Sequence, residues 1–166
     1  NPSASSAYRM GTMSYTRSDY NKAIEYFKAG MDLDDNDDRK ADYALRIATA
    51  YTKIDSKANA RSFAMKAAGL RSGWGDPYLL IGDLYASTKG CGTNEFEVKS
   101  VFWAAIDKYE YARFIDPSVA DAAAQRIKNS KVHAPDKTLA FQYGKHEATT
   151  VSVGCWINED AKVRLD

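Results

Sequence analysis

The sequence lacks several features that commonly identify a protein's chemistry. It has 166 residues but only two cysteines, Cys91 and Cys155, which lie far apart and outside any Cys-x-x-Cys spacing. This arrangement argues against a zinc site and against a thioredoxin-like redox motif. The residues alone leave two alternatives open for the pair: two free thiols in a reducing compartment, or one disulfide in an oxidising one.

The sequence also lacks an excess of charge of one sign and a long apolar run. Its 23 lysines and arginines nearly balance its 22 aspartates and glutamates, so no overall field favours nucleic acid or anionic lipid. No stretch approaches the roughly 18 consecutive apolar residues typical of a membrane-spanning helix. We therefore expect no nucleic-acid partner and no membrane span. The length suits one domain over residues 1–166.

No pattern of catalytic or metal-binding residues is present. The sequence around Cys155 has no nucleophile elbow and no oxyanion signature, and His133 and His146 lie outside any catalytic motif. The acidic stretch 32–38 lacks the glycine and the bidentate glutamate that a calcium-binding loop requires. We predict a protein that is not an enzyme and has no metal site and no cofactor. A thiol hydrolase using Cys155 is the last-ranked alternative.

The sequence does contain a recurring helical pattern, which is clearest between residues 76 and 117. A first predicted helix has one face built around a glycine, comprising Tyr78, Ile81, Gly82 and Tyr85. A second predicted helix carries small and aromatic residues on one face, namely Ala105, Tyr109 and Ala112. It ends before Pro117, which cannot continue a helix. The two stretches indicate a pair of facing helices.

Earlier parts of the chain repeat this pattern. Three residues precede their counterparts in the first helix by 34 positions each: Ile47, Ala48 and Tyr51. Three others hold the places of the second-helix residues: Ala23, Phe27 and Gly30. Small residues recur where the two helices of a pair should cross, at Gly11, Ala48 and Gly82. A small residue at such a crossing lets two helix backbones approach closely.

The pattern resembles the tetratricopeptide repeat (TPR), a helix-turn-helix unit with the consensus W-x2-L-G-x2-Y…A-x3-F…P. Tyr78 stands in place of the tryptophan, Ile81 of the leucine and Tyr109 of the phenylalanine. The resemblance implies an all-α fold, an α-solenoid of three units at residues 4–34, 39–72 and 76–117. The third unit contains about eleven additional residues, placed at 89–100.

Beyond the third unit we expect a capping helix at residues 118–130, with Ser118 as its N-cap. The tail at 136–166 is predicted to form a short helix and then a small β-hairpin. Alternating residues predict strands at 149–157 and 162–165, joined by a turn at 158–160. A lone hairpin is only marginally stable in water, so it must dock on the helices or pair with another chain.

The tail resembles the C-terminal ends of certain repeat proteins of the Gram-negative cell envelope. The resemblance rests on the Asp-Pro-Ser at 116–118, the following Ala-rich helix and the Val-Gly-Cys-Trp-Ile-Asn-Glu at 153–159. It implies a Cys91–Cys155 disulfide and a periplasmic or cell-envelope location, while the residues alone leave the cytoplasm open. Because the chain begins at Asn1, we expect a processed chain or a part of a longer one.

In TPR proteins the first helices of successive units line a concave surface that usually holds peptides. The resemblance therefore implies a non-catalytic scaffold or adaptor that binds another protein or a peptide. The residues expected on this surface are Tyr8, Arg9, Thr12, Tyr15, Arg46, Thr49, Lys53 and Asp83.

Two alternatives to peptide binding in this groove stay open. One is a solvated groove with the partner bound elsewhere, and the other is self-association through the hairpin edge and the first unit. Some repeat domains clamp a C-terminal carboxylate with a basic pattern, which Leu45, Asp76 and Asp83 interrupt here. We therefore do not expect recognition of chaperone tails.

Overall fold

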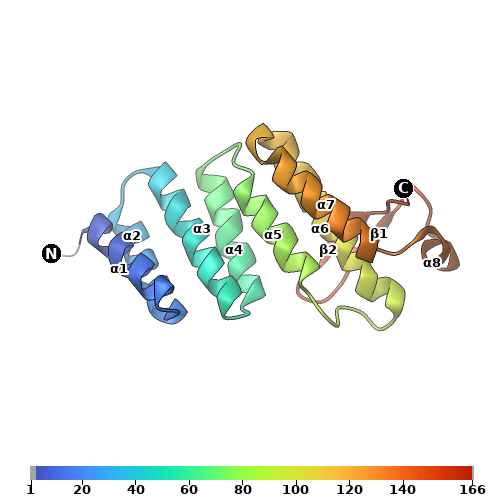
Figure 1. Ribbon diagram of the computed structural model, residues 1–166, viewed down its shortest axis with the longest axis horizontal. Coiled ribbons are helices and arrows are strands. Elements are labelled where there is room, and N and C mark those ends of the chain that lie inside the picture. Colours follow the sequence, from blue (N-terminus) through green and yellow to red (C-terminus); the bar gives the residue numbers. More distant parts are fainter. Residues whose placement is uncertain (1–2, 166) are drawn as a thin grey trace. The chain divides into compact units, whose positions relative to one another are not determined.

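A computed structural model describes residues 3–165 and is mostly helical, with TPR-like helix pairs followed by a two-stranded antiparallel hairpin (Figure 1). The predicted fold class is confirmed. The chain divides into two compact units, residues 1–80 and 81–166, which are called the first and the second unit below. The three predicted helix-turn-helix units are called repeats. The elements are α1 (Ala4–Thr16), α2 (Tyr20–Leu33), α3 (Asp37–Lys53), α4 (Lys57–Leu70), α5 (Asp76–Ala86), α6 (Glu95–Ile115), the 3-10 helix η1 (Pro117–Val119), α7 (Ala120–His133), α8 (Lys137–Gln142), β1 (Thr150–Val153) and β2 (Glu159–Lys162).

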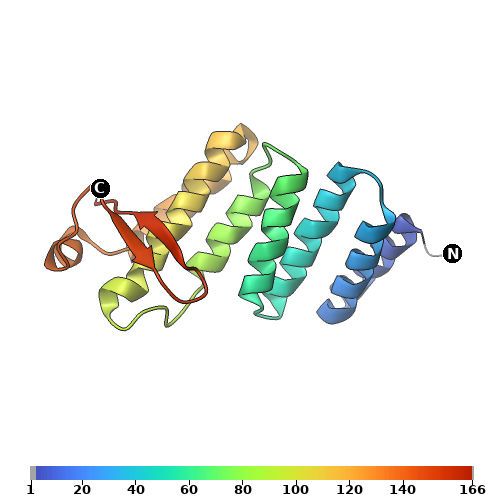
Figure 2. The same cartoon turned by 180° about the vertical axis from the view of Figure 1, so that it is seen from behind.

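The first unit contains the helix pairs α1–α2 and α3–α4, whose apolar faces share one core. Helices α1 and α3 form the layer nearer the viewer in Figure 1, and α2 and α4 form the layer nearer the viewer in Figure 2. The core comprises Ala23, Ile24, Phe27, Met31, Tyr43, Ala44, Ile47, Ala50 and Ala67. None of the helices within residues 3–165 combines the length and the apolar character needed to cross a bilayer.

The two glycines at predicted helix crossings lie against aromatic rings. A Cβ atom on Gly11 would lie 2.6 Å from the Phe27 ring, and one on Gly82 would lie 2.3 Å from the Tyr109 ring. Such distances are too short for a real Cβ, so only glycine lets these rings pack against the helix backbone. The second repeat instead has fully buried alanines at both corresponding positions, Ala48 and Ala64. The crossing role predicted for the small residues is confirmed.

The loop between α2 and α3 is shorter than the sequence indicated, because part of the acidic stretch is helical. The predicted repeat limits, 4–34 and 39–72, leave residues 35–38 between the repeats, but Asp37 and Asp38 form the first turn of α3. The Asn36 side chain caps this helix by accepting a hydrogen bond from the backbone N–H of Arg39 at 2.9 Å. Carboxylates in the first turn interact favourably with the positive end of the helix dipole, which explains the earlier start.

The predicted N-cap at Ser118 is wrong. The Asp116 side chain accepts from the backbone N–H of Ser118 at 3.0 Å and from the Ser118 hydroxyl. Asp116 thereby caps the short η1 turn that contains Pro117, and α7 continues from Ala120 without a side-chain cap. Proline fixes φ near the helical value at the start of such a turn, so the aspartate before it becomes the cap.

In the second unit, the residues inserted in the third repeat form a loop and lengthen a helix. Helix α6 begins at Glu95 and has 21 residues, so part of the segment 89–100 adds turns to its start. The Asn94 side chain caps it by accepting from the backbone N–H of Glu97 at 3.0 Å. Its fully buried residues include Val101, Trp103, Ile106 and Tyr109.

The hairpin packs against α6 and α5 through two carboxylates. Asp107 of α6 accepts from the backbone N–H of Lys162 at 3.0 Å and forms an ion pair with Arg164. Glu159 of β2 accepts from the Tyr85 hydroxyl at 2.7 Å and pairs with the ammonium group of Lys108. The inward-facing side chains of the hairpin are buried beneath these contacts: Val151, Val153, Ala161 and Val163. Docking on the helices, as expected for a lone hairpin, is observed.

The predicted strand limits are wrong because the turn comes earlier. Strand β1 ends at Val153, and residues 154–158 form the turn. Cys155 and Asn158 have φ angles of 50° and 47°, which an extended strand does not allow. The Trp156 ring packs edge-on against Tyr85, with centroids 5.4 Å apart.

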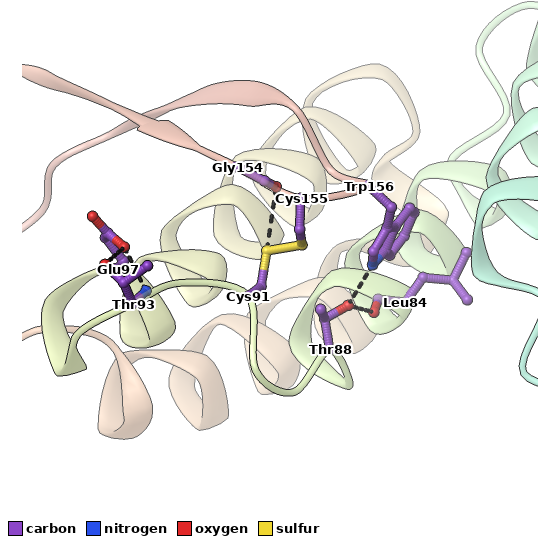
Figure 3. The surroundings of a disulfide bond; sticks show 8 residues. All are labelled: Leu84, Thr88, Cys91, Thr93, Glu97, Gly154, Cys155 and Trp156. Atoms are coloured by element: carbon purple, nitrogen blue, oxygen red, sulfur yellow. Dashed lines mark hydrogen bonds between the residues drawn. A yellow bond between two sulfur atoms is a disulfide. The ribbon is translucent and has the colours of Figure 1, made fainter.

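A disulfide joins Cys91 to Cys155, whose Cα atoms lie 5.6 Å apart. Figure 3 shows the bond beneath the turn, with the Trp156 Nε1–H donating to the Thr88 hydroxyl at 3.2 Å. Cys91 is only 3% exposed, whereas Cys155 is exposed. The bond therefore attaches the hairpin turn to the loop between α5 and α6, as the tail resemblance implied.

We predict that Gly82→Ala lowers the free energy of unfolding by about 1–3 kcal/mol, because the added methyl group overlaps the Tyr109 ring. The matched control is Gly69→Ala in α4, where an added Cβ meets no atom within 4 Å. This control should leave stability unchanged or raise it by up to about 1 kcal/mol through helix propensity. Urea unfolding measures both values, and equal effects of the two variants would contradict the packing role of Gly82.

We also predict that Cys91→Ala/Cys155→Ala lowers the free energy of unfolding by up to about 4 kcal/mol, the chain-entropy value for a loop of this length. The bond spans 64 residues of sequence. Mass spectrometry after alkylation of the native protein should show no modified thiol without reductant and two with it. Two alkylatable thiols in unreduced native protein would refute the bond.

Candidate functional site

The candidate surface in the first unit is the α1–α3 face, which we define by its predicted binding residues. They are Tyr8, Arg9, Thr12 and Tyr15 on α1, and Arg46, Thr49 and Lys53 on α3. Both helices belong to the same layer of the unit (Figure 1). The eighth predicted residue, Asp83, belongs to the second unit.

Tyr8 is the centre of the α1–α3 face. Its half-buried ring lies 6.0 Å from the Phe27 ring and 5.6 Å from the Tyr43 ring, the latter edge-on. The Arg46 guanidinium lies over the Tyr8 ring, 4.8 Å from its centroid, where the ring quadrupole attracts the cation. The structure thus brings two predicted residues from different helices into direct contact.

The other polar residues of the face contribute less to recognition. The Thr12 hydroxyl donates to the Tyr8 carbonyl at 2.9 Å, and the Thr49 hydroxyl donates to the Leu45 carbonyl at 2.8 Å. Their hydroxyl hydrogens are therefore committed to their own helices, which leaves only lone pairs for a ligand. The Tyr15 ring packs edge-on against Tyr20, with centroids 5.3 Å apart, and stabilises the α1–α2 connection.

The charges of the α1–α3 face are all positive. Arg9 is the only charged residue of α1, and α3 beyond Asp42 carries only Arg46 and Lys53. All three cations are exposed. Within residues 3–165, none of them takes part in a salt bridge or a side-chain hydrogen bond, so their donors face solvent.

A cavity of about 640 Å³ lies beside Tyr8 and Arg9, at the N-terminal ends of α1 and α3. Its other lining residues include several that sequence reasoning did not assign to the site: Asp34, Asp35, Arg39, Asp42 and Tyr43. The buried Tyr43 donates its hydroxyl to the Ala4 carbonyl at 2.7 Å. The predicted surface did not include them because it was taken from one side of the first helix of each repeat, whereas these residues belong to the connection after α2 and to the first turns of α3. In the sequence, the ion pair beside the cavity is indicated by the arginine at position 39, which follows Asp34 near the start of α3.

Asp34 closes one wall of this cavity through a bidentate ion pair. It is 6% exposed and accepts from the Nε of Arg39 at 2.9 and 2.8 Å, and from the backbone N–H of Asn36 at 3.0 Å. The Arg39 hydrogen bond, followed by that from Asn36, lowers the pKa of the Asp34 carboxyl. The pair is neutral overall, and Asp42 is likewise paired with Arg71 at 3.1 Å.

Asp83, in the second unit, is already bound by neighbouring side chains. It accepts from the Tyr109 hydroxyl at 2.9 Å and from the Nε of Arg126 at 2.9 Å. Burial, followed by the negative charge of Asp83, strongly raises the pKa of Tyr109. Asp83 also lines a cavity of about 230 Å³ with Phe102 and His133, among others. Its main role is therefore to join α5 to α6 and α7.

The thiol-hydrolase alternative has no nucleophile in this structure. The sequence has only two cysteines, and Cys155 is bonded to Cys91. A sulfur in a disulfide is neither a thiol nor a thiolate, and the thiolate is the nucleophilic form.

Comparison with known proteins supports the fold. A scan against models of known families and a search of curated proteins found no match. Solved structures do match: the TPR2B domain of yeast Sti1 in a pHsp70 complex has 19% identity and a TM-score of 0.60, covering 78% of this chain and 96% of that one. The Arabidopsis OM64 TPR domain has 18% identity and a TM-score of 0.59, with coverages of 78% and 95%.

A third similar structure carries a bound peptide. It is the first TPR of Spaghetti (RPAP3) bound to the HSP90 peptide SRMEEVD, with 19% identity, a TM-score of 0.59 and coverages of 78% of this chain and 90% of that one. At this level of identity the likeness concerns the fold. It agrees with the helix pairs of this chain.

We predict that Asp34→Asn lowers the free energy of unfolding at pH 6 but has a smaller effect in acid. Because the pKa of Asp34 is lowered from its ordinary 3.8, its stabilising contribution is complete above pH 3.8 and is lost as pH falls through the lower folded-state pKa. Urea unfolding at pH 6 and at several pH values below 4 measures this difference. The control is Asp35→Asn, an exposed neighbour, and equal pH profiles for both variants would contradict the role of Asp34.

Proposed function

We propose that this chain is a non-catalytic adaptor that holds an extended peptide, or a helix of another protein, on the α1–α3 face. The observation that carries the proposal is the set of exposed cations on this face, which form no salt bridge within residues 3–165, together with the half-buried aromatic ring of Tyr8. Aromatic and arginine side chains are enriched at protein interfaces. Similar folds support the proposal, because two solved TPR domains of RPAP3 are complexes with the peptides SRMEEVD and SGPTIEEVD.

We propose that the ligand of this chain differs from those chaperone peptides. Leu45 offers no charge to a terminal carboxylate, and Asp76 and Asp83 would repel one. Asp83 is moreover bound to Tyr109 and Arg126. A partner held by the first unit, through Arg9, Arg46 and Lys53, agrees better with the distribution of charge.

The adaptor is proposed to act within a cell-envelope assembly. The disulfide between Cys91 and Cys155 supports an oxidising compartment, since disulfides persist in the periplasm and are rare in the cytosol. The resemblance of the tail to cell-envelope repeat proteins agrees with the same location.

Self-association through the hairpin edge has less support. Val163 N–H donates to the Thr149 carbonyl, so the ladder pattern directs the backbone groups of Lys162 outward from the hairpin. These groups are occupied by Asp107 and by the guanidinium of Arg164. On the other edge, the Thr150 carbonyl accepts from Lys145 at 3.3 Å. An edge covered in this way is a poor template for another strand.

Site-specific photo-crosslinking tests the proposed function. A photoreactive amino acid at position 16, exposed on α1 one turn after Thr12 of the α1–α3 face, leaves Arg9, Arg46 and Lys53 in place and should crosslink a discrete partner in extract of the native organism. The same group at position 65, exposed on α4, should not. Mass spectrometry then identifies the crosslinked segment of the partner.

Charge reversal provides the matched control. Arg46→Glu should abolish the crosslink from position 16, because it replaces the cation stacked on Tyr8 with a carboxylate. Lys66→Glu, on α4, has the same change in charge and should leave the crosslink intact. Crosslinks that form only from position 65, or that persist in Arg46→Glu, would place the binding surface elsewhere.

A further inference from the structure

We infer that the segment held on the α1–α3 face is acidic and is recognised through its internal side-chain carboxylates rather than through its C-terminus. This inference rests on the proposed function and specifies the chemistry of the partner. It follows from the arrangement of Arg9, Arg46 and Lys53.

The contact between Arg46 and Tyr8 prepares a carboxylate site. The guanidinium lies over the ring at 4.8 Å, which holds its position while leaving its N–H donors unused within residues 3–165. Guanidinium donors form a planar fork that matches a carboxylate with two parallel hydrogen bonds. Because the side chain is already held in place, binding costs less conformational entropy.

Arg9 adds a second cation next to this pair. It follows Tyr8 in the sequence and lines the same cavity as Tyr8. Arg9 and Arg46 hold the same position in successive repeats, each two residues before the small crossing residue. In the third repeat this position is Leu80. The arginine thus occurs at this position in the first two repeats and not in the third.

The nearby carboxylates do not neutralise these cations. Asp34 is bound to Arg39, and Asp42 is bound to Arg71, which leaves Asp35 as the lining carboxylate without a salt bridge in the described part of the chain. Lys53 lies seven residues after Arg46, or about 10 Å along the same side of α3. A chain rises about 3.3–3.6 Å per residue when extended, so acidic side chains two to four residues apart reach both cations.

The test uses fluorescein-labelled ten-residue peptides of alternating glutamate and serine, with amidated and with free C-termini, and a lysine–serine counterpart. Fluorescence anisotropy should detect binding of both acidic peptides with similar affinity, decreasing as salt is added, and no binding of the basic peptide. Binding of the lysine peptide with equal affinity, or binding of the acidic peptide only with a free C-terminus, would overturn the inference.

Matched double variants assign the binding to the two arginines. Arg9→Gln/Arg46→Gln should weaken binding of the acidic peptide by at least about tenfold. Lys22→Gln/Lys66→Gln removes the same charge from exposed positions of α2 and α4 and should not. Arg9→Lys/Arg46→Lys should bind with intermediate affinity, because lysine keeps the charge but loses the planar fork. Equal loss in the first two variants would overturn the assignment.

The outcome also separates this inference from the function on which it rests. If the acidic peptides fail to bind while position 16 still crosslinks a partner, the inference is wrong and the adaptor function stands. If neither the peptides nor the crosslink gives a signal, both are wrong. Circular dichroism of each variant confirms that the exposed substitutions leave the fold intact.

Discussion

The contact between a glycine backbone and an aromatic ring is the constraint on which the helix pairs of the first and third repeats depend. Gly11 receives Phe27 in the first repeat, and Gly82 receives Tyr109 in the third. Each ring lies where a methyl group would otherwise be, so the two helices cross at short distance. In the first unit the Gly11–Phe27 contact holds α1 against α2, and a similar contact of Gly30 with the Tyr43 ring holds α2 against α3. Together with the core beneath them, these contacts fix the layer of α1 and α3. The position of Tyr8, and therefore of Arg46, follows from that layer.

The sequence predicted the repeated elements because their signals are local and periodic. The glycine positions, the 34-residue offset and the stop before Pro117 each reflect a physical requirement of a helix pair. The tail was predicted less accurately. Alternation suggested that Cys155 lay in a strand, whereas its positive φ places it in a turn. That conformation is stabilised by the bond to Cys91 and by the packing of Trp156 on Tyr85, and both are contacts between distant segments that periodicity does not report.

The candidate site likewise combines features that the sequence predicted with features that it did not. Tyr8 and Arg46 lie on α1 and α3, two helices of one layer, but their stacking depends on side-chain directions across the two helices. Asp83 has the expected position on α5, yet it is bound to Arg126, 43 residues away. The Asp34–Arg39 pair escaped prediction because composition alone does not show which carboxylate of an acidic stretch is buried and paired with an arginine. Interactions between residues distant in sequence account for most of what was missed.

The unequal exposure of the two cysteines has a consequence for how the second unit is made. Cys91 is almost completely buried in the finished structure, whereas Cys155 reaches solvent. An enzyme that transfers a disulfide must therefore act on Cys91 before the turn closes over it, or attack from the Cys155 side. The carboxylate anchors at Asp107 and Glu159 are independent of the sulfur atoms, so they can align the turn before the bond forms. Formation of the disulfide then fixes the hairpin in its native register.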